Sequence, residues 1–223
     1  MTADGSVSFH NERLDESYHS NTGAIEESFL KFVKPAADIF LEKNPSADSI
    51  SVLDMFYGLG YNSLCMMYYL REIRCFKGKI RLVGLELDPE IMGFSKDIQF
   101  TEEVNSKMLD DAGIIIDPEK FNNYYANLDV DVIMGDANAT VNGIDEKFDV
   151  IIFDPFSPKK QPELWTEKFF RDISRLAKEG TVLTTYSCAR VAKDGLAKAG
   201  FIVRKGPSVG RKAPSTIAVF AHI

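Results

Sequence analysis

Short apolar runs alternate along this chain with longer segments in which apolar residues recur at helical spacing. The runs have the length and the β-branched or aromatic content of buried strands, and turn residues bound them. Five such runs lie at residues 50–53, 79–87, 130–134, 148–153 and 180–186, helical segments lie at 63–70, 162–178 and 189–199, and residues 201–205 and 216–221 form a closing strand pair. This alternation predicts an α/β fold with a doubly wound, Rossmann-like sheet and a closing antiparallel strand.

Two regions fall outside the alternation. The chain begins with a polar, turn-rich stretch, after which residues 24–43 have the apolar spacing of a helix that we expect Pro35 to divide into two. Residues 90–128 are longer than a simple crossover requires and predict an insertion of polar helices. We therefore expect an N-terminal extension with helices over residues 1–45, and a larger domain over residues 46–223 that contains the insertion.

Candidate site residues stand where the predicted strands end. Gly58 and Gly60 form a tight turn after the first strand, where backbone N–H groups can approach a cofactor without a Cβ in the way. Glu86, Asp136 and Asp154 follow the next three strands, and the carboxyl ends of parallel strands meet at one edge of a sheet. We expect Glu86 to accept ribose hydroxyls and Asp136 to accept the adenine amine of a nucleotide-type cofactor. Three neighbours are assigned to the same cofactor site: Tyr57, Asn62 and Ala137.

The pattern favours S-adenosylmethionine over a dinucleotide. The turn lacks the third glycine of G-x-G-x-x-G, since position 63 is Ser, so it offers no phosphate cradle. An acidic cleft also suits a sulfonium cation. A G-x-G turn alone is compatible with an ordinary turn of an α/β protein, and Asp136 could equally cap the helix that follows it. The prediction therefore rests on four candidates at neighbouring strand ends.

Composition narrows the class of protein. No apolar run approaches the roughly 20 residues of a membrane helix, so we expect no membrane partner. The N-terminus lacks the basic start and apolar stretch of a signal peptide. The three cysteines are odd in number and the three histidines are scattered, so we expect reduced thiols, a cytoplasmic protein and no metal site.

Charge is divided unevenly along the chain. The net charge is −7, yet from Pro155 to the end there are 13 Lys and Arg against 5 Asp and Glu, a net of +8. A division of this kind can mark a side that faces nucleic acid. Sequence halves need not be spatial halves, so a mixed, solvated surface stays open as the alternative.

Several motifs together resemble the methyltransferase half of MnmC, the bifunctional tRNA wobble-uridine modification enzyme. They are V-L-D-M-F-Y-G-L-G-Y-N-S-L, G-D-A-N, F-D-P-F-S-P-K-K-Q-P-E-L-W, G-x-x-x-G-R-K and the N-terminal Y-H-S-N-T-G-A-I-E-E, which cover nearly the whole chain except residues 90–128. The resemblance implies a class I S-adenosylmethionine-dependent methyltransferase that methylates the aminomethyl nitrogen of the wobble uridine in tRNA. It implies catalytic roles for Asp154 and Tyr18, a second role for Asp154 at the cofactor, and substrate contacts from Ser20, Glu27, Phe156, Pro158, Arg211 and Lys212.

The chain departs from the family pattern in three respects. Phe56 stands where the family has its first motif glycine, and Pro155 stands where it has Gly after the acid of the catalytic loop. The chain ends at Ile223 without a flavin-dependent oxidase half, so we expect no FAD. We then expect another protein to supply the aminomethyl group.

Two other kinds of protein share these features. Aminopropyl transferases related to spermidine synthase have the same fold, a late acidic loop and an amine nucleophile, and would act on a small amine without tRNA. A nucleotide-binding module without catalysis is the second alternative, although it has no need of a carboxylate such as Asp154 beyond the cofactor pocket. Asp154 itself could also cap its loop or bind the amino group of the cofactor.

Overall fold

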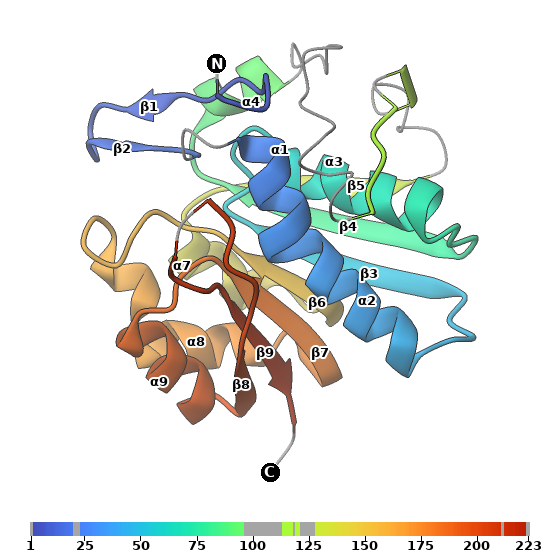
Figure 1. Ribbon diagram of the computed structural model, residues 1–223. Coiled ribbons are helices and arrows are strands. Elements are labelled where there is room, and N and C mark those ends of the chain that lie inside the picture. Colours follow the sequence, from blue (N-terminus) through green and yellow to red (C-terminus); the bar gives the residue numbers. More distant parts are fainter. Residues whose placement is uncertain are drawn as a thin grey trace.

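The computed structural model describes residues 2–19, 23–95, 113–117, 119–120, 128–210 and 212–221. Its main sheet has seven strands in the order β5-β4-β3-β6-β7-β9-β8 (Figure 1). The strands are β3 (Ser49–Met55), β4 (Lys79–Glu86), β5 (Asp129–Met134), β6 (Phe148–Phe153), β7 (Ala177–Thr185), β8 (Phe201–Lys205) and β9 (Thr216–Phe220). The first five are parallel, and β9 runs antiparallel between β7 and β8. The predicted α/β sheet with a closing antiparallel strand is confirmed.

Helices cover both faces of the sheet because its central strands are apolar on both sides. Ile50 and Val52 of β3 pack in one core cluster, and Leu53 and Met55 pack in the other. The first cluster includes residues of α1 (Ala24–Glu27), η1 (Ser28–Val33), α2 (Lys34–Lys43), α3 (Tyr61–Tyr68) and η2 (Tyr69–Ile73). The second includes residues of α7 (Ala137–Thr140), η3 (Val141–Gly143), η4 (Pro162–Trp165), α8 (Glu167–Ser174) and α9 (Arg190–Lys198).

The helical segment before β3 is continuous, which corrects the expectation that Pro35 divides it. Figure 1 shows α1 and α2 as one run, and Ser28, Val33 and Lys34 at the junctions all have right-handed helical dihedrals. The stretch from Ser28 to Val33 is π-helical and leads directly into the first turn of α2, where Pro35 stands. Pro35 cannot donate a backbone hydrogen bond, but its turn directly follows a π-helical stretch, where the regular i to i−4 hydrogen-bond pattern is already interrupted.

The helix expected at residues 162–178 is shorter than predicted. A 3₁₀ turn, η4, comes first, and Thr166 then begins α8 as its N-cap, accepting a hydrogen bond from the Phe169 N–H at 3.2 Å. Strand β7 begins at Ala177, so Lys178 belongs to the sheet. Gly180 has a positive φ (+84°), and β7 continues on both sides of it.

The N-terminal extension contains an element that the sequence did not predict, a hairpin of β1 (His10–Asn11) and β2 (Glu16–Ser17). In the region of the predicted insertion, α4 (Pro89–Ser95) is described, and residues 96–112, 118 and 121–127 lie outside the described part. No helix of the described residues is long and apolar enough to cross a membrane.

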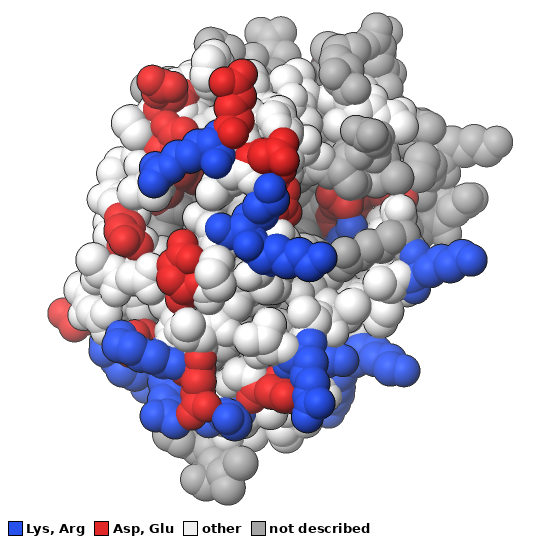
Figure 2. All heavy atoms as spheres, turned by 90° about the vertical axis from the view of Figure 1, so that its left-hand side faces the viewer, with Lys and Arg blue, Asp and Glu red and all other residues white. Residues whose placement is uncertain are grey.

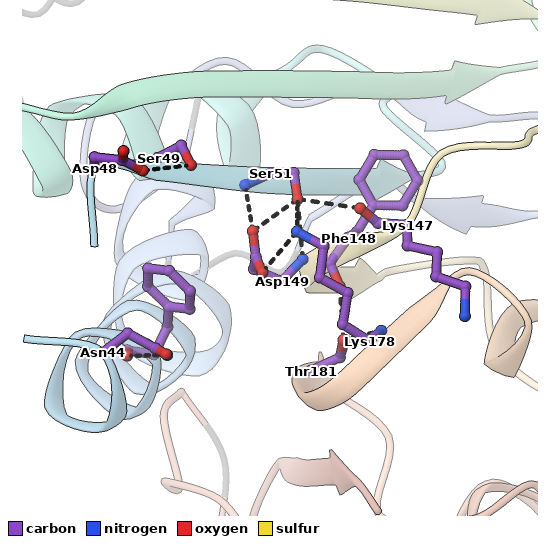
Figure 3. A network of polar contacts seen from close by, with 10 residues as sticks. Asn44, Asp48, Ser49, Ser51, Lys147, Phe148, Asp149, Lys178 and Thr181 are labelled. Atoms are coloured by element: carbon purple, nitrogen blue, oxygen red, sulfur yellow. Dashed lines mark hydrogen bonds and ion pairs between the residues drawn. The ribbon is translucent and has the colours of Figure 1, made fainter. Parts of the chain in front are cut away.

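A polar network fastens three central strands at their amino ends. Ser51 of β3 donates to Asp149 of β6 at 2.7 Å, and the Lys178 ammonium of β7 donates to Asp149 at 2.8 Å and to Ser51 at 3.0 Å (Figure 3). This end of the sheet lies opposite the carboxyl ends that carry the candidate site residues. The network therefore holds the strands in place without taking part in the site.

Candidate active site

A cavity of about 960 Å³ lies at the carboxyl ends of the parallel strands and is covered in part by the N-terminal hairpin. Volumes of this order accommodate a cofactor together with part of a substrate. Seven of the residues predicted from the sequence line it: Tyr18, Glu27, Glu86, Asp136, Ala137, Asp154 and Phe156. Residues from five separate segments therefore meet where the sequence analysis expected one site.

The turn after β3 has three residues with positive φ: Phe56 (+67°), Gly58 (+55°) and Gly60 (+84°). A Cβ on Gly60 would lie 2.8 Å from the Tyr57 hydroxyl oxygen, so this position requires glycine. Phe56 adopts the backbone conformation that its counterpart glycine in the family would take freely. Its ring packs edge-on against Phe153, with centroids 5.6 Å apart, and lines the cavity.

Unlike Phe56, the turn residues that are predicted to bind the cofactor do not line the cavity. Tyr57, Gly58, Gly60 and Asn62 are not among the residues that line the cavity. The ring of Tyr57 packs against the backbone of β4, where a Cβ on Gly84 would lie 2.5 Å from Tyr57 Cδ2. A contribution of Tyr57 to the cofactor therefore stays a prediction that would act through the shape of the turn.

Glu86 ends β4 and joins it to the glycine turn. Its Oε2 accepts the Gly58 N–H at 2.7 Å, and its Oε1 accepts the N–H groups of Leu87 and Asp88 at 2.8 Å each. An ionised carboxylate has about four acceptor positions, so three backbone donors leave one for a ligand hydroxyl. The expected contact with ribose stays a prediction, and the structure adds that Glu86 also shapes the turn.

Asp136 caps α7, as the alternative interpretation of the G-D-A-N motif held. Its Oδ1 accepts the Asn138 N–H at 2.9 Å and the Asn138 side-chain amide at 3.1 Å. The cap does not remove Asp136 from the cavity, which it lines together with Ala137 in the first turn of the helix. Capping and cofactor binding are thus compatible at this position.

Asp154 follows β6 and is held by Asn62, whose side-chain amide donates to Asp154 Oδ2 at 3.0 Å. Burial raises the pKa of Asp154 to about 7, while the Asn62 hydrogen bond acts in the opposite direction. Two further charges act on it: Glu27 raises the pKa of Asp154 and Lys31 lowers it. A carboxyl group that titrates near neutral pH in a cavity can exchange a proton with a substrate amine.

Asp54 is a buried acid that the sequence analysis did not single out. It lies in β3 just before the glycine turn, is completely buried, and accepts a hydrogen bond from the Ser63 hydroxyl. Its Oδ1 has no hydrogen-bond partner among the described residues. Burial raises the pKa of Asp54 to about 8, and the nearby Asp154 adds to this rise. An acid inside an otherwise apolar strand was the signal available in the sequence.

The hairpin is fastened to the loop that carries Asp154. Glu16 accepts from the Ser157 hydroxyl at 2.7 Å and from the Ser157 N–H at 3.2 Å. The rings of Tyr18 and Phe156 meet edge-on with centroids 5.0 Å apart, and burial raises the pKa of Tyr18 to about 12. His19 also lines the cavity, and burial lowers its pKa to about 4, so its imidazole is neutral at pH 7.

The remaining predicted substrate contacts lie away from the cavity or outside the described residues. Pro158 and Lys212 do not line the cavity, and Ser20 and Arg211 fall outside the described part of the chain. No cluster of three or more His, Cys, Asp or Glu side chains suited to a metal ion occurs among the described residues.

The basic C-terminal third does not form a surface of a single charge. Figure 2 shows Lys and Arg gathered on the lower part of the face, at the level of α8 and α9 in Figure 1, with Asp and Glu among them. The C-terminal third also contains ion pairs, since Lys168 pairs with Asp172 and Lys198 pairs with Glu167. A nucleic-acid-facing side therefore stays a prediction.

Residues 99–221, more than half of the chain, match a family model described as S-adenosyl-L-methionine-dependent methyltransferase. The chain belongs to this family. The cofactor predicted from the strand-end acids is therefore confirmed as S-adenosylmethionine, while the residues that hold it remain predictions.

Individual relatives support the resemblance to MnmC. The crystal structure of MnmC2 from Aquifex aeolicus matches 97% of this chain and 68% of its own, with 29% identity and a TM-score of 0.74. The tRNA 5-methylaminomethyl-2-thiouridine biosynthesis bifunctional protein MnmC of Campylobacter concisus is 27% identical over 96% of this chain. A protein of Methanocaldococcus jannaschii, the uncharacterized MJ0670, is 30% identical over 97% of it. The methyltransferase spans 34% of the length of that MnmC and 58% of that of MJ0670.

The cavity of this methyltransferase has the chemical groups that S-adenosylmethionine requires. Glu86, at the end of β4, retains an acceptor position for a ribose hydroxyl. Asp136 and Ala137 lie at the start of α7, which follows β5, the strand next to β4. Asp154 supplies a carboxylate on the far side of the glycine turn. The residues present therefore fit the cofactor.

Proposed function

We propose that this methyltransferase transfers a methyl group from S-adenosylmethionine to the aminomethyl nitrogen of a modified wobble uridine in tRNA. Two things support the proposal: the similarity to MnmC proteins over nearly the whole chain, and the position of Asp154 in the cavity. The decisive observation is the carboxyl group of Asp154, which lines the cavity and is held there by a hydrogen bond from Asn62. A tRNA substrate also places the protein in the cytoplasm.

The acceptor determines what the residues must do. An aliphatic amine is mostly an ammonium ion at pH 7 and then has no lone pair with which to attack. Asp154 binds the ammonium group, takes a proton from it and orients the nitrogen, while Asn62 fixes the direction of the carboxylate. Tyr18 and Phe156 form an aromatic wall that excludes water from the acceptor. S-adenosylmethionine, when bound, supplies the electrophilic methyl group.

The N-terminal segment completes this arrangement. We propose that residues 1–45 act as a cover for a methyltransferase domain of residues 46–223, with an insertion at about 90–128. The hydrogen bonds from Ser157 to Glu16 support this division of roles, because they fasten the hairpin to the catalytic loop. Closing the hairpin over the cavity separates the reacting amine from solvent.

Replacing Asp154 tests the mechanism. Asp154→Asn keeps the shape of the side chain and removes its charge and basicity, so we expect turnover to fall by roughly 10²–10⁴-fold. S-adenosylmethionine affinity, measured by calorimetry, should stay within a few-fold of the wild type. Asp145→Asn, which removes an exposed carboxylate at the opposite end of the sheet, is the matched control. Near-normal turnover of Asp154→Asn would refute the assignment.

The pH dependence gives a second test of the same residue. Since only the ionised carboxylate can take a proton from the acceptor, turnover in the wild type should rise with pH through about 7. Asp154→Asn should lose this step in the profile. A profile that is identical in both proteins would assign the titration to another group.

Acceptor identity is tested with radiolabelled S-adenosylmethionine. We expect label to enter undermodified tRNA, and nucleoside mass spectrometry should place the new methyl group on the aminomethyl nitrogen of the wobble uridine. Putrescine serves as the alternative acceptor. Transfer to putrescine and not to tRNA would favour a small-amine enzyme, and cofactor binding without any transfer would favour a binding module.

A further inference from the structure

A buried lysine lies in the wall of the cavity close to the catalytic acid. Lys31 is on the π-helical stretch η1, its side chain is only 6% exposed, and it lines the cavity. Its ammonium group pairs with Glu27, four residues earlier on the same helical segment, whose side chain is 13% exposed. Lysine is rarely this buried unless its charge has a partner or a ligand to meet.

Glu27 leaves part of the ammonium group unused. A lysine ammonium has three N–H donors, and the described residues provide one hydrogen-bond partner, the Oε1 of Glu27. Two donors therefore have no acceptor among the described residues. Lys31, Glu27 and Asp154 all line this one cavity. The charges of Lys31 and Glu27 also act electrostatically on Asp154.

We propose, on the basis of the function proposed above, that Lys31 selects the acceptor by donating a hydrogen bond to the pyrimidine carbonyl oxygen beside the reacting aminomethyl group. In a 5-aminomethyluridine this carbonyl stands on the ring carbon adjacent to the one that carries the aminomethyl group. The two groups that recognise nitrogen and oxygen must therefore be neighbours in the protein. Asp154 and Lys31 line the same cavity and supply the two kinds of group, one an acceptor for the nitrogen and the other a donor for the oxygen.

The same lysine rejects acceptors of another class. A diamine such as putrescine carries a second ammonium group and no carbonyl, so it brings a positive charge toward Lys31 and leaves the two donors unsatisfied. Repulsion between two cations is strong where both are shielded from water. Lys31 therefore distinguishes a uridine amine from a polyamine, although the fold and the acidic loop suit both.

The test compares two acceptors in one variant. Lys31→Met keeps an unbranched side chain, one atom shorter, and removes charge and donors, so kcat/KM for undermodified tRNA should fall roughly 10- to 100-fold. Inhibition of tRNA methylation by putrescine should become stronger, with an inhibition constant lower by roughly tenfold or more. S-adenosylmethionine affinity should not change. The control is Lys34→Met, because Lys34 pairs with Asp38 at 2.9 Å and does not line the cavity.

Removing Lys31 alone leaves the Glu27 carboxylate without its cation, which endangers folding. The comparison is therefore repeated in a Glu27→Gln background, where adding Lys31→Met creates no unpaired charge and should still lower kcat/KM for tRNA and strengthen inhibition by putrescine. Unchanged tRNA kinetics and unchanged putrescine inhibition in both backgrounds would make the pair purely structural and overturn this inference alone. A wild-type protein that does not methylate tRNA would overturn both this inference and the proposed function.

Discussion

The buried carboxyl group of Asp54 should make the stability of the folded protein depend on pH in a specific way. Asp54 is completely buried in β3, and one of its oxygens has no hydrogen-bond partner among the described residues. Burial raises its pKa to about 8, whereas an unfolded chain ionises the same group near pH 3.9. Folding therefore requires a proton on Asp54 over most of the neutral range.

The sign and size of the effect follow from this difference. Because the pKa in the folded state is the higher one, the contribution of Asp54 to stability is fully present below about pH 4 and is lost as the pH rises to about 8. Between these values the loss is roughly 1.4 kcal/mol per pH unit, which sums to roughly 6 kcal/mol over about four units. Asp54→Asn is neutral at every pH and can still accept the hydrogen bond from Ser63.

Urea unfolding at a series of pH values measures the difference between the two proteins. We expect Asp54→Asn to gain stability relative to the wild type by roughly 1.4 kcal/mol for each unit of pH between about 5 and 8. Asp48→Asn removes an exposed carboxylate just before the same strand and controls for the change in net charge. A difference that does not vary with pH would mean that Asp54 is ionised in the folded protein, which would refute the reasoning.

Two further predictions concern the glycine turn and the tRNA surface. Because Phe56 has a φ of +67°, Phe56→Gly should be more stable to urea than Phe56→Ala by about 1 kcal/mol, the reverse of the usual order; equal stabilities would show that the turn carries no strain. The family resemblance implies tRNA contacts from Arg211 and Lys212, so charge reversal at both should weaken tRNA binding and reduce the slope of log affinity against log salt by about one for each phosphate that the protein no longer neutralises. Lys147→Glu, at the amino end of β6 (Figure 3), should leave that slope unchanged, and a wild-type slope in the double variant would contradict the assignment.

Most of the sheet was predictable because each strand is an apolar run of its own. The runs at β3, β4 and β6 are short, apolar and buried on both faces, which is typical of the strands of a parallel sheet. Two helix boundaries were not predictable in the same way. From the sequence, Thr166 could lie inside one long helix or could cap the start of a new one. In the structure it caps α8, whose Phe169 and Phe170 pack in the core. At Pro35 the helical run continues because a π-helical stretch, Ser28–Val33, directly precedes the turn that contains the proline, and the sequence pattern carries no signal for it.

The candidate site was predictable where it depends on strand ends and not where it depends on contacts between distant segments. Glu86, Asp136 and Asp154 reach one cavity because parallel strands end at one edge of the sheet. No comparable sequence pattern indicates that Glu16 and Lys31 lie at this cavity. Glu16 is 141 residues from its partner Ser157, and Lys31 faces the cavity through a π-helical stretch that shifts the usual helical spacing.

In the function that we propose, the N-terminal segment forms part of the acceptor site, since several of its residues line the cavity. The proposed cofactor end of the cavity is formed by strand ends of the sheet, which the two core clusters hold in place. The acceptor end takes Tyr18, Glu27 and Lys31 from residues that precede the first strand of the main sheet. Changes in this segment should consequently alter acceptor choice before they alter cofactor binding. Relatives that share this sheet could thus act on different amines while binding the same cofactor.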